Sequence, residues 1–478
     1  MNGDLKISRE SMQHKLDKLT ALERIKLLFD EDTFVEIEGL VANKNSGVVT
    51  GYGTINGRLV YAYSIDYNIN GGAINKINSK KICNLIDMSG KMGAPLVQIY
   101  DSIGGELSEN LNIFNCYGSI INRNAKLSGV IPQISLVCGS CTGLLALSAA
   151  MSDFTVMVKD QAEVYINDPE DIIESQGEYI SIEMYGQSKH CSNIGNVQIV
   201  ADNEKESINM VRKIVSYLPS NNIELPYSDL DVNENLSANI DNVVNEYNID
   251  GIIEYLCDKE SIIEINKDVS EKLRTFLGKI HGMTVGILAN SDDNNGLTIK
   301  DLNKITKLVK VCDCFNISII SLVNCEGFIK NLEEEKNGIL LEAAKALATI
   351  SQASVPKVSL IYGTSYGAIY TMLAGKGISF DVVYAWPNSK ICITKPDKLL
   401  KIVYRKEILS SEVPIKKEEE IIKDRINNIT NPYSAAEEGY VDDIILPDET
   451  RARISNALEM LQSKREVNYP KKHGSILI

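Results

Sequence analysis

A chain of 478 residues is longer than one ordinary hydrophobic core, so two domains are the first expectation. The net charge of −15, from 49 Lys and Arg against 64 Asp and Glu, argues against a nucleic-acid-binding surface. No run of 18 apolar residues occurs and the N-terminal segment is polar, so we expect neither a transmembrane helix nor a secretory signal, and a cytoplasmic location.

The ten cysteines lie mostly in apolar stretches, which is typical of reduced, buried thiols. Cys138 and Cys141 form a C-x-x-C pair, which by itself suggests a zinc site or a redox disulfide. Zinc needs a second pair of ligands, and the four histidines are far apart, with His190 the nearest in sequence. We therefore expect two packed thiols and no metal.

Short β-branched stretches alternate with helical patterns in both halves of the chain. The elements expected in the first half are a strand at 58–66, a helix at 80–92, a strand at 96–101, a second helix and a strand at 133–139. Those expected in the second half are a strand at 285–290, a helix at 304–315, a strand at 319–324, a second helix and a strand at 357–363. Such alternation predicts an α/β fold with mostly parallel strands.

The two halves are also similar in sequence. PQISLVCGSCTG at 132–143 aligns without gaps with PKVSLIYGTSYG at 356–367, an offset of 224 residues. Three further pairs of stretches align at offsets between 223 and 228. We infer a duplicated domain, with copies at 1–240 and 241–478 and a Pro-, Asn- and Asp-rich linker within 217–243.

Each copy has a strand that ends in G-x-x-x-G and is followed by a helix of small residues, at Gly139–Gly143 and at Gly363–Gly367. The first amides of such a helix have no partner within the helix, and the helix dipole favours a negative group there. One interpretation is an oxyanion hole made of backbone amides. The alternative is that glycine only allows a close approach of helix and strand.

Eight longer stretches resemble the carboxyltransferase β-subunits of biotin-dependent acyl-CoA carboxylases, such as the propionyl-CoA carboxylase β chain, and those of acyl-CoA decarboxylases. The matching segments are 46–67, 70–83, 128–143, 152–160, 312–323, 384–387, 431–445 and 449–454. The resemblance implies two crotonase-like (ClpP/crotonase) spiral α/β domains in each chain, usually assembled as a hexamer with substrates bound between domains of neighbouring subunits.

The resemblance also implies a function and a set of residues. In that family one turn holds the thioester oxygen of an acyl-CoA and the other holds the ureido oxygen of biotin. The backbone amides that correspond here belong to Gly143, Leu144, Ala368 and Ile369. The residues expected to contact substrate are Gly71, Gly72, Gly104, Gly139, Gly363, Gly367 and Thr371. In the family's mechanism no side chain acts as acid or base, and propionyl-CoA or methylmalonyl-CoA is a typical substrate.

Several positions depart from the family pattern. Leu144 and Ala368 replace glycines, and a leucine that needs a positive φ would cost about 1–2 kcal/mol. Glu106 replaces an arginine, and Leu341-Glu342 replaces an Arg-His pair. Two alternatives therefore stay open. The chain can be a catalytically degenerate paralogue with a structural or regulatory part in a hetero-oligomer. It can also be a thioester hydrolase or isomerase on the same fold, which needs a placed carboxylate, and the sequence gives no reason to prefer Glu106 or Glu109 for that role.

The expected partners also follow from the resemblance. The sequence shows neither an ATP-binding domain nor an A-M-K-M-like biotinylation site, so biotin is expected on a partner, the biotin carboxyl carrier protein. A biotin carboxylase or a membrane decarboxylase subunit is the other expected companion, in a homo- or hetero-oligomer. The charged segment 411–425 predicts a solvated amphipathic helix, and the C-terminal 469–478 is expected to pack against the assembly.

Overall fold

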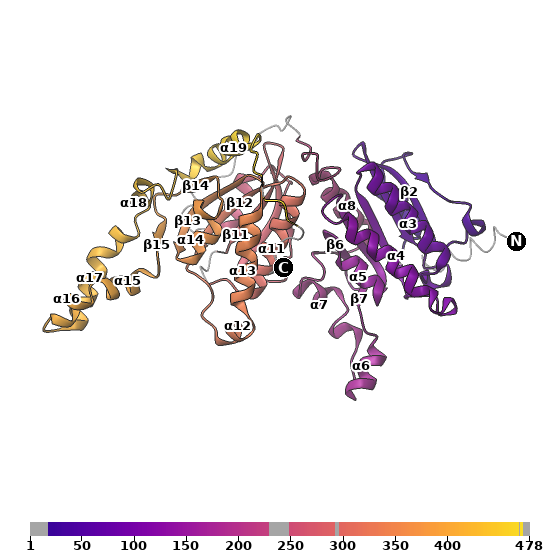
Figure 1. The fold of residues 1–478 in the computed structure, drawn as a ribbon, viewed down its shortest axis with the longest axis horizontal. Coiled ribbons are helices and arrows are strands. Elements are labelled where there is room, and N and C mark those ends of the chain that lie inside the picture. The colour runs from indigo at the N-terminus through magenta and orange to yellow at the C-terminus, as the bar shows by residue number, and fades with distance from the viewer. Residues whose placement is uncertain (1–17, 229–247, 292–295, 468, 472–478) are drawn as a thin grey trace. The chain divides into compact units, whose positions relative to one another are not determined.

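The chain forms two units, each built around its own sheet (Figure 1). The computed structural model of the protein describes residues 18–228, 248–291, 296–467 and 469–471. Unit 1 extends to Tyr227 and also includes 266–269 and 314–316, and unit 2 contains the other described residues. The predicted domain boundary at 240/241 and most of the predicted linker lie outside the described residues, so both stay predictions.

The sheet of unit 1 has the order β1-β2-β3-β4-β5-β6-β8, and β7 pairs with β5. The β1–β2 and β2–β3 pairings are antiparallel, and the other pairings are parallel. Its strands are β1 (Val35–Glu36), β2 (Val48–Ile55), β3 (Arg58–Ile65), β4 (Leu96–Ser102), β5 (Gln133–Thr142), β6 (Phe154–Val158), β7 (Glu163–Tyr165) and β8 (Ile199–Ala201). Every residue of β4 is buried, as parallel strands covered on both faces require.

Helices of unit 1 connect these strands, and α3 begins with a capping box in which Asn75 and Asn78 bond each other's backbone amides. The helices are α2 (Ala21–Leu28), α3 (Lys76–Met92), α4 (Asn112–Leu127), α5 (Leu144–Ala150), α6 (Pro169–Gln176), α7 (Ser188–Asn193) and α8 (Glu204–Tyr217). Because α5 starts two residues after β5 ends, the turn between them is held at both ends by regular structure.

The sheet of unit 2 repeats this topology, with the order β9-β10-β11-β12-β13-β14-β16 and with β15 paired to β13. Its β9–β10 and β10–β11 pairings are antiparallel and the rest are parallel. The strands are β9 (Ile263–Ile265), β10 (Leu273–Ile280), β11 (Met283–Asn290), β12 (Ser318–Cys325), β13 (Lys357–Tyr366), β14 (Val382–Ala385), β15 (Lys390–Cys392) and β16 (Asp443–Ile444). The predicted pair of crotonase-like α/β domains is thus confirmed as a fold class.

The helices of unit 2 include an arm, α15–α17, that extends away from its sheet (Figure 1). The helices are α10 (Ile249–Leu256), α11 (Ile299–Cys314), α12 (Leu332–Lys336), α13 (Ile339–Gln352), α14 (Ala368–Leu373), α15 (Pro396–Val403), α16 (Arg405–Ser410), α17 (Pro414–Ile429), α18 (Pro432–Glu437) and α19 (Thr450–Leu461). The helix predicted at 411–425 is α17, in which only Ile421 is buried. Residues 472–478 lie outside the described part of the chain.

An Asp–Arg pair anchors the hairpin that opens unit 1. The Asp30 carboxylate accepts the amides of Asn56 and Gly57, at 3.1 and 2.9 Å, in the turn between β2 and β3. Arg212, in α8, donates to Asp30 across 2.7 Å. Burial alone would raise the pKa of Asp30, but the hydrogen bonds from Gly57, Arg212 and others hold it at about 2.

In unit 2 an Asp–Arg pair anchors the corresponding hairpin. Asp258 accepts the amides of His281 and Gly282, at 3.0 and 2.8 Å, in the turn between β10 and β11. Arg451, in the last helix of the unit, donates to Asp258 across 2.8 Å. Asp258 follows Asp30 by 228 residues, one of the offsets of the sequence repeat. The duplication is therefore visible in side-chain contacts as well as in topology.

Candidate functional site

A bulge interrupts the parallel pairing at the centre of each sheet. In unit 1, Tyr100 pairs with Val137 and Ser102 pairs with Cys141. Asp101 therefore faces three residues of β5, 138–140. Such bulges bend a strand and change the direction in which its end points. Here the bulge sets the path of β5 into the turn that follows it.

The bulge of unit 2 has the same form. Val323 pairs with Ile361 and Cys325 pairs with Ser365, so Asn324 faces 362–364. The Asn324 side-chain oxygen accepts hydrogen bonds from the amide and the hydroxyl of Thr364, both at 3.0 Å. An amide that the bulge removes from the ladder is thereby satisfied.

Glycine at the centre of each bulge leaves room for the facing side chain. A Cβ on Gly139 would lie 1.9 Å from Asp101 Oδ1, and one on Gly363 would lie 2.3 Å from Asn324 Oδ1. Packing inside the chain therefore explains both glycines, but the close neighbour is a side chain of the adjacent strand and not a helix. Their contact with a substrate stays a prediction.

The turn after each bulge has a backbone conformation that only glycine adopts readily. Gly143 has φ 59° and ψ −132°, and Gly367 has φ 57° and ψ −126°. The Gly143 amide donates to Tyr165 O and the Gly367 amide to Cys392 O, each across 2.9 Å. This corrects the prediction for Gly143, because its amide is bonded within the sheet and does not face outward. Gly143 contributes to the turn by adopting torsion angles that other residues rarely adopt.

The amides that follow these glycines begin a helix. Leu144 is the first residue of α5 and Ala368 the first of α14. The first hydrogen bond within α14 runs from the Thr371 amide to Gly367 O, across 3.5 Å, so the amides of Ala368 and Ile369 have no acceptor within the helix. Within the part of the chain that the structure describes, no hydrogen bond engages the amides of Leu144, Ala368 or Ile369.

The replaced glycines of the sequence analysis are not strained. Neither Leu144 nor Ala368 has a positive φ, so the expected cost of a leucine at 144 does not arise. Leu144 is 38% exposed and therefore lies at the surface. A leucine amide donates as well as a glycine amide, so the first turn keeps its donor.

The predicted glycines of the other loops in unit 1 gather at the same edge of the sheet. Gly71 O accepts the amide of Ile103 at 3.0 Å, and Gly72 O accepts the Ser102 hydroxyl at 2.7 Å. These bonds join the loop at 70–72 to the end of β4. A Cβ on Gly104 would lie 3.5 Å from the Oγ1 of Thr142, the residue before Gly143. The structure thus brings Gly71, Gly72 and Gly104 to the edge that carries the first turn.

Two carboxylates near this edge are already engaged. Glu106 accepts the side-chain amide of Asn75 at 3.0 Å, and Glu109 accepts the backbone amide of Lys76 at 3.2 Å. Both carboxylates therefore cap the start of α3, where negative charge is favourable. This arrangement gives no support to the alternative in which one of them is a catalytic acid or base.

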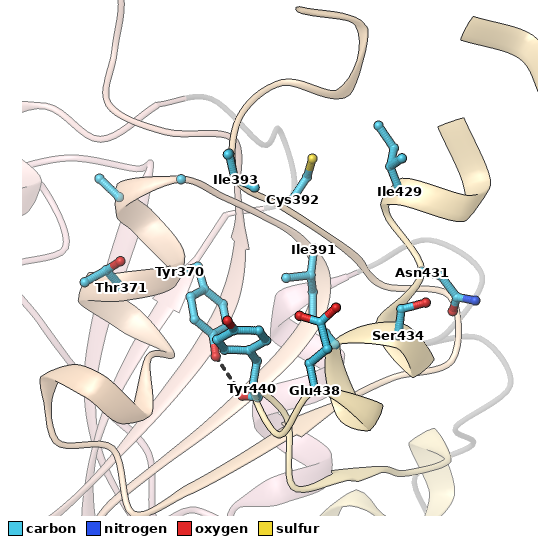
Figure 2. A pocket seen from close by; sticks show the side chains of 13 residues that line it. Tyr370, Thr371, Ile391, Cys392, Ile393, Ile429, Asn431, Ser434, Glu438 and Tyr440 are labelled. Carbon is cyan, nitrogen blue, oxygen red and sulfur yellow. Dashed lines mark hydrogen bonds between the residues drawn. The ribbon is translucent and has the colours of Figure 1, made fainter. Parts of the chain in front are cut away.

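A cavity of about 660 Å³ opens at the second turn (Figure 2). Its wall is formed by Gly367, Ala368, Tyr370 and Thr371 of the turn and α14, by Ile391, Cys392 and Ile393 of β15 and the following residue, and by Ile429, Asn431, Ser434, Ala435, Glu438 and Tyr440 around α18. Thr371, a predicted contact residue, is thus one of the cavity's polar groups. The segments around 391–393 and 429–440 were not predicted as site residues, although 431–445 contributed to the family resemblance.

Tyr370 closes one side of this cavity. Its hydroxyl donates to Tyr440 O across 2.7 Å, which joins α14 to the segment after α18 (Figure 2). Burial raises the pKa of Tyr370 to about 12, and Tyr440 and Asp442 add to the effect. The phenol is therefore neutral near pH 7 and acts as a hydrogen-bond donor. It holds two walls of the cavity together.

Cys138 and Cys141 are free, fully buried thiols. Burial raises the pKa of both well above its usual value, so neither is a thiolate at neutral pH. Among the described residues, no group of three or more His, Cys, Asp or Glu side chains is placed to hold a metal ion. No helix in the described ranges is long and apolar enough to span a bilayer.

Comparison with known proteins identifies the family. The model of the carboxyl transferase domain matches residues 12–476. The chain is 36% identical to the methylmalonyl-CoA decarboxylase subunit alpha of Propionigenium modestum and 34% identical to the carboxyltransferase subunit of propionyl-CoA carboxylase from Haloferax mediterranei. Each match covers 98% of this chain and 95% of the relative. The chain belongs to the carboxyl transferase family, and the resemblance seen in its sequence is confirmed.

A solved structure supports the same assignment. Transcarboxylase 12S, determined as a hexamer with methylmalonyl-CoA and methylmalonic acid bound, matches with a TM-score of 0.91 and 32% identity. The match covers 98% of this chain and 94% of the transcarboxylase chain. The two-unit fold is therefore the same as that of the transcarboxylase 12S chain.

Proposed function

We propose that the chain is a carboxyltransferase subunit that moves a carboxyl group between carboxybiotin on a carrier protein and a small acyl-CoA, such as propionyl-CoA or methylmalonyl-CoA. One observation carries this proposal: the two units present the same turn, with torsion angles within a few degrees of each other at Gly143 and Gly367. A transfer between two carbonyl compounds needs two places where negative charge on oxygen is stabilised, and the duplicated turn offers two.

The first turn is proposed to hold the thioester oxygen. Removal of the α-carboxyl group, or of the α-proton, leaves an enolate whose charge lies largely on that oxygen. The Leu144 amide, at the start of α5, points a donor and the positive end of the helix dipole at this charge. In well-studied oxyanion holes one donor lowers the barrier by about 3–4 kcal/mol. Backbone donors are fixed before the reaction, so no reorganisation is needed.

The second turn, with its cavity, is proposed to receive the ring of biotin. The amides of Ala368 and Ile369 are the proposed donors to the ureido oxygen. Ala368 belongs to the cavity wall, whereas Ile369 is fully buried and is not among the lining residues. The cavity walls at Ile391, Ile393 and Ile429 are apolar. A volume of about 660 Å³ lies within the range of small-molecule sites. When bound there, carboxybiotin would supply the carboxyl group by cleavage of its N–C bond, and the ureido nitrogen freed by that cleavage would accept the α-proton of the acyl-CoA. The residues of this chain bind, orient and polarise, and no side chain has to accept or donate a proton.

The partners proposed for this function are a biotin carboxyl carrier protein and either a biotin carboxylase or a membrane-embedded decarboxylase subunit. One relative is named a subunit of a decarboxylase and another a subunit of a carboxylase, which supports a place in a complex of one of these kinds. We further propose a hexamer, as in transcarboxylase 12S, and a cytoplasmic location.

The test uses the purified full chain with malonyl-CoA or methylmalonyl-CoA and free biotin, and it measures loss of the carboxyl group as carbon dioxide. Turnover that depends on biotin is the expected result. A parallel binding measurement with the corresponding acyl-CoA separates the outcomes. Binding without turnover would show a site that needs its carrier protein. Neither binding nor turnover would contradict the proposal and favour a structural subunit.

A further inference from the structure

Unit 1 has a buried group of charges directly behind its bulge. Arg24 of α2 donates to Asp101 across 3.0 Å and to Glu204 of α8 across 2.7 and 3.0 Å. The side chains of Arg24 and Asp101 are fully buried, and that of Glu204 is 4% exposed. Lys18 also approaches Asp101, at 3.4 Å. The residue that faces the bulge is thus held by an ionic network.

Unit 2 builds the same bulge without charges. Asn324 takes the place of Asp101 there, and its partner is Thr364. At the offset of 228 that relates the two hairpin aspartates, Arg24 aligns with Ile252, which is 2% exposed in the apolar core of unit 2. The fold of a unit therefore does not require an arginine or a carboxylate at these positions.

Stability does not explain why unit 1 has these charges. A buried ionic group often contributes less than apolar side chains of similar volume, because desolvation offsets the attraction between the charges. Arg24 Nη1 also lacks a hydrogen-bond partner within the described part of the chain, which adds an unfavourable contribution. A network of this kind is better suited to fixing one arrangement than to increasing stability.

Two contacts connect the network to the bulge. Gln161 donates to Glu204 across 2.6 Å and to the carbonyl oxygen of Cys138 across 2.7 Å. Asp101 fills the space beside Gly139, where a side chain would otherwise lie. The network therefore holds the bulge at two successive residues, and the chain reaches Leu144 a few residues later.

We propose that Arg24, Asp101 and Glu204 are positioning residues for the first turn, and that they aim the Leu144 amide by fixing the bulge at 138–140. The effect on catalysis rests on the function proposed above, whereas the effect on the bulge does not. Misplacement of a catalytic group by about 1 Å can lower a rate by about 100-fold. Loss of the network should therefore lower kcat and leave the KM for the acyl-CoA nearly unchanged.

The experiment compares Arg24→Met/Asp101→Asn/Glu204→Gln, which removes all three charges together, with Asp101→Asn, which introduces the residue of unit 2. Asp30→Asn is the matched control, because it breaks a carboxylate–arginine pair in the same unit. That pair lies where β3 begins, whereas the bulge lies where the parallel strand β4 ends. Amide hydrogen exchange over 138–143, kcat and KM are measured for each variant and for the parent chain.

We expect exchange over 138–143 to become at least about tenfold faster than the measured loss of global stability accounts for in both network variants and not in the control, with kcat lowered about 10- to 100-fold at unchanged KM. Exchange and kcat equal to those of the parent chain in both network variants would overturn the inference. If the triple variant does not fold, Asp101→Asn decides. If the parent chain shows no turnover, the proposed function fails, and the exchange data alone decide whether the network positions the bulge.

Discussion

The amide of Gly367 donates a hydrogen bond across 2.9 Å to the carbonyl oxygen of Cys392, the last residue of β15. The amide of Gly143 makes the same bond, at the same length, to Tyr165, the last residue of β7. In each unit a short parallel strand thus fixes the glycine whose torsion angles start the helix. The bond made by the glycine amide holds the turn in place. The amide of the next residue, Leu144 or Ala368, is left without a partner in the described part of the chain.

The torsion angles of Gly143 predict the effect of a methyl group there. Gly143→Ala should destabilise the protein by about 1–3 kcal/mol, because an alanine at φ 59° and ψ −132° is strained although its Cβ would have no neighbour within 4 Å. Gly118→Ala is the control, since Gly118 lies in α4 and its Cβ would also meet nothing. It should stabilise by about 0.5–1 kcal/mol. Denaturant unfolding of both variants checks this, and equal shifts would contradict it.

Proline at the first position of α5 should remove the proposed donor without breaking the helix. Proline has no amide hydrogen but is tolerated at this position, and the preceding glycine has no Cβ to clash with it. Leu144→Pro should lower kcat about 100-fold or more, with a small change in unfolding temperature. Leu144→Gly, which keeps the amide, should retain much more activity than Leu144→Pro.

The matched control is Leu332→Pro, the same substitution at the first position of α12, where the leucine is 68% exposed. Steady-state kinetics of the three variants make the comparison. A Leu144→Pro variant with the kcat of Leu332→Pro would show that the Leu144 amide does not stabilise the transition state.

Much of the fold can be predicted from the sequence, because the chain is duplicated and the elements assigned in one half support those assigned in the other. The offset between 132–143 and 356–367 predicted two α/β copies, and alternation of strands and helices predicted their parallel pairing. The G-x-x-x-G spacing located both turns. The spacing carries no information on the direction of a hydrogen bond. It therefore predicts an outward donor at Gly143, although that amide is bonded to Tyr165.

The remainder of the site depends on contacts between distant segments. Arg24 and Glu204 are 180 residues apart, and no local pattern relates them. The cavity at the second turn takes its walls from α14, from the residues around Cys392 and from α18. For α18 the sequence offers one signal, the family resemblance of 431–445. That resemblance shows that the segment is common to the family, but it does not show that the segment lines a cavity.

Asp30 should contribute stability that depends on pH. Its pKa is about 2 in the folded protein, below the value of 3.8 expected when unfolded, so its contribution is complete above about pH 4 and is lost as the pH falls toward 2. Asp30→Asn should lower the free energy of unfolding by roughly 2 kcal/mol at pH 7. Urea unfolding of parent and variant at pH 7, 4 and 3 measures this difference. A difference that does not shrink at the lowest pH would contradict the assignment.

Lys357 should also make stability rise with pH, but in a higher pH range and because its charged form destabilises the folded state. Its amino group is buried at the start of β13, where it donates to the carbonyl oxygens of Ile350 and Ala353. Burial and the nearby charge of Lys464 lower its pKa to about 8, against a usual value of 10.5. The folded state therefore holds its proton less tightly than the unfolded state. This destabilises the protein below about pH 8, and the effect is relieved as the pH rises from 8 toward 10.5.

Unit 1 shows which neutral side chain fits this position. Gln133 lies 224 residues before Lys357, and its side chain donates across 2.9 Å to Asn124 O in the last turn of the preceding helix, as Lys357 donates to Ile350 O. Lys357→Gln should therefore stabilise the protein at pH 7, by at most roughly 2–3 kcal/mol, and the gain should diminish between pH 8 and 10. Unfolding by urea at pH 7, 8.5 and 10 follows the difference from the parent chain. A gain that is equal at all three values would show that the charge of Lys357 is not its source.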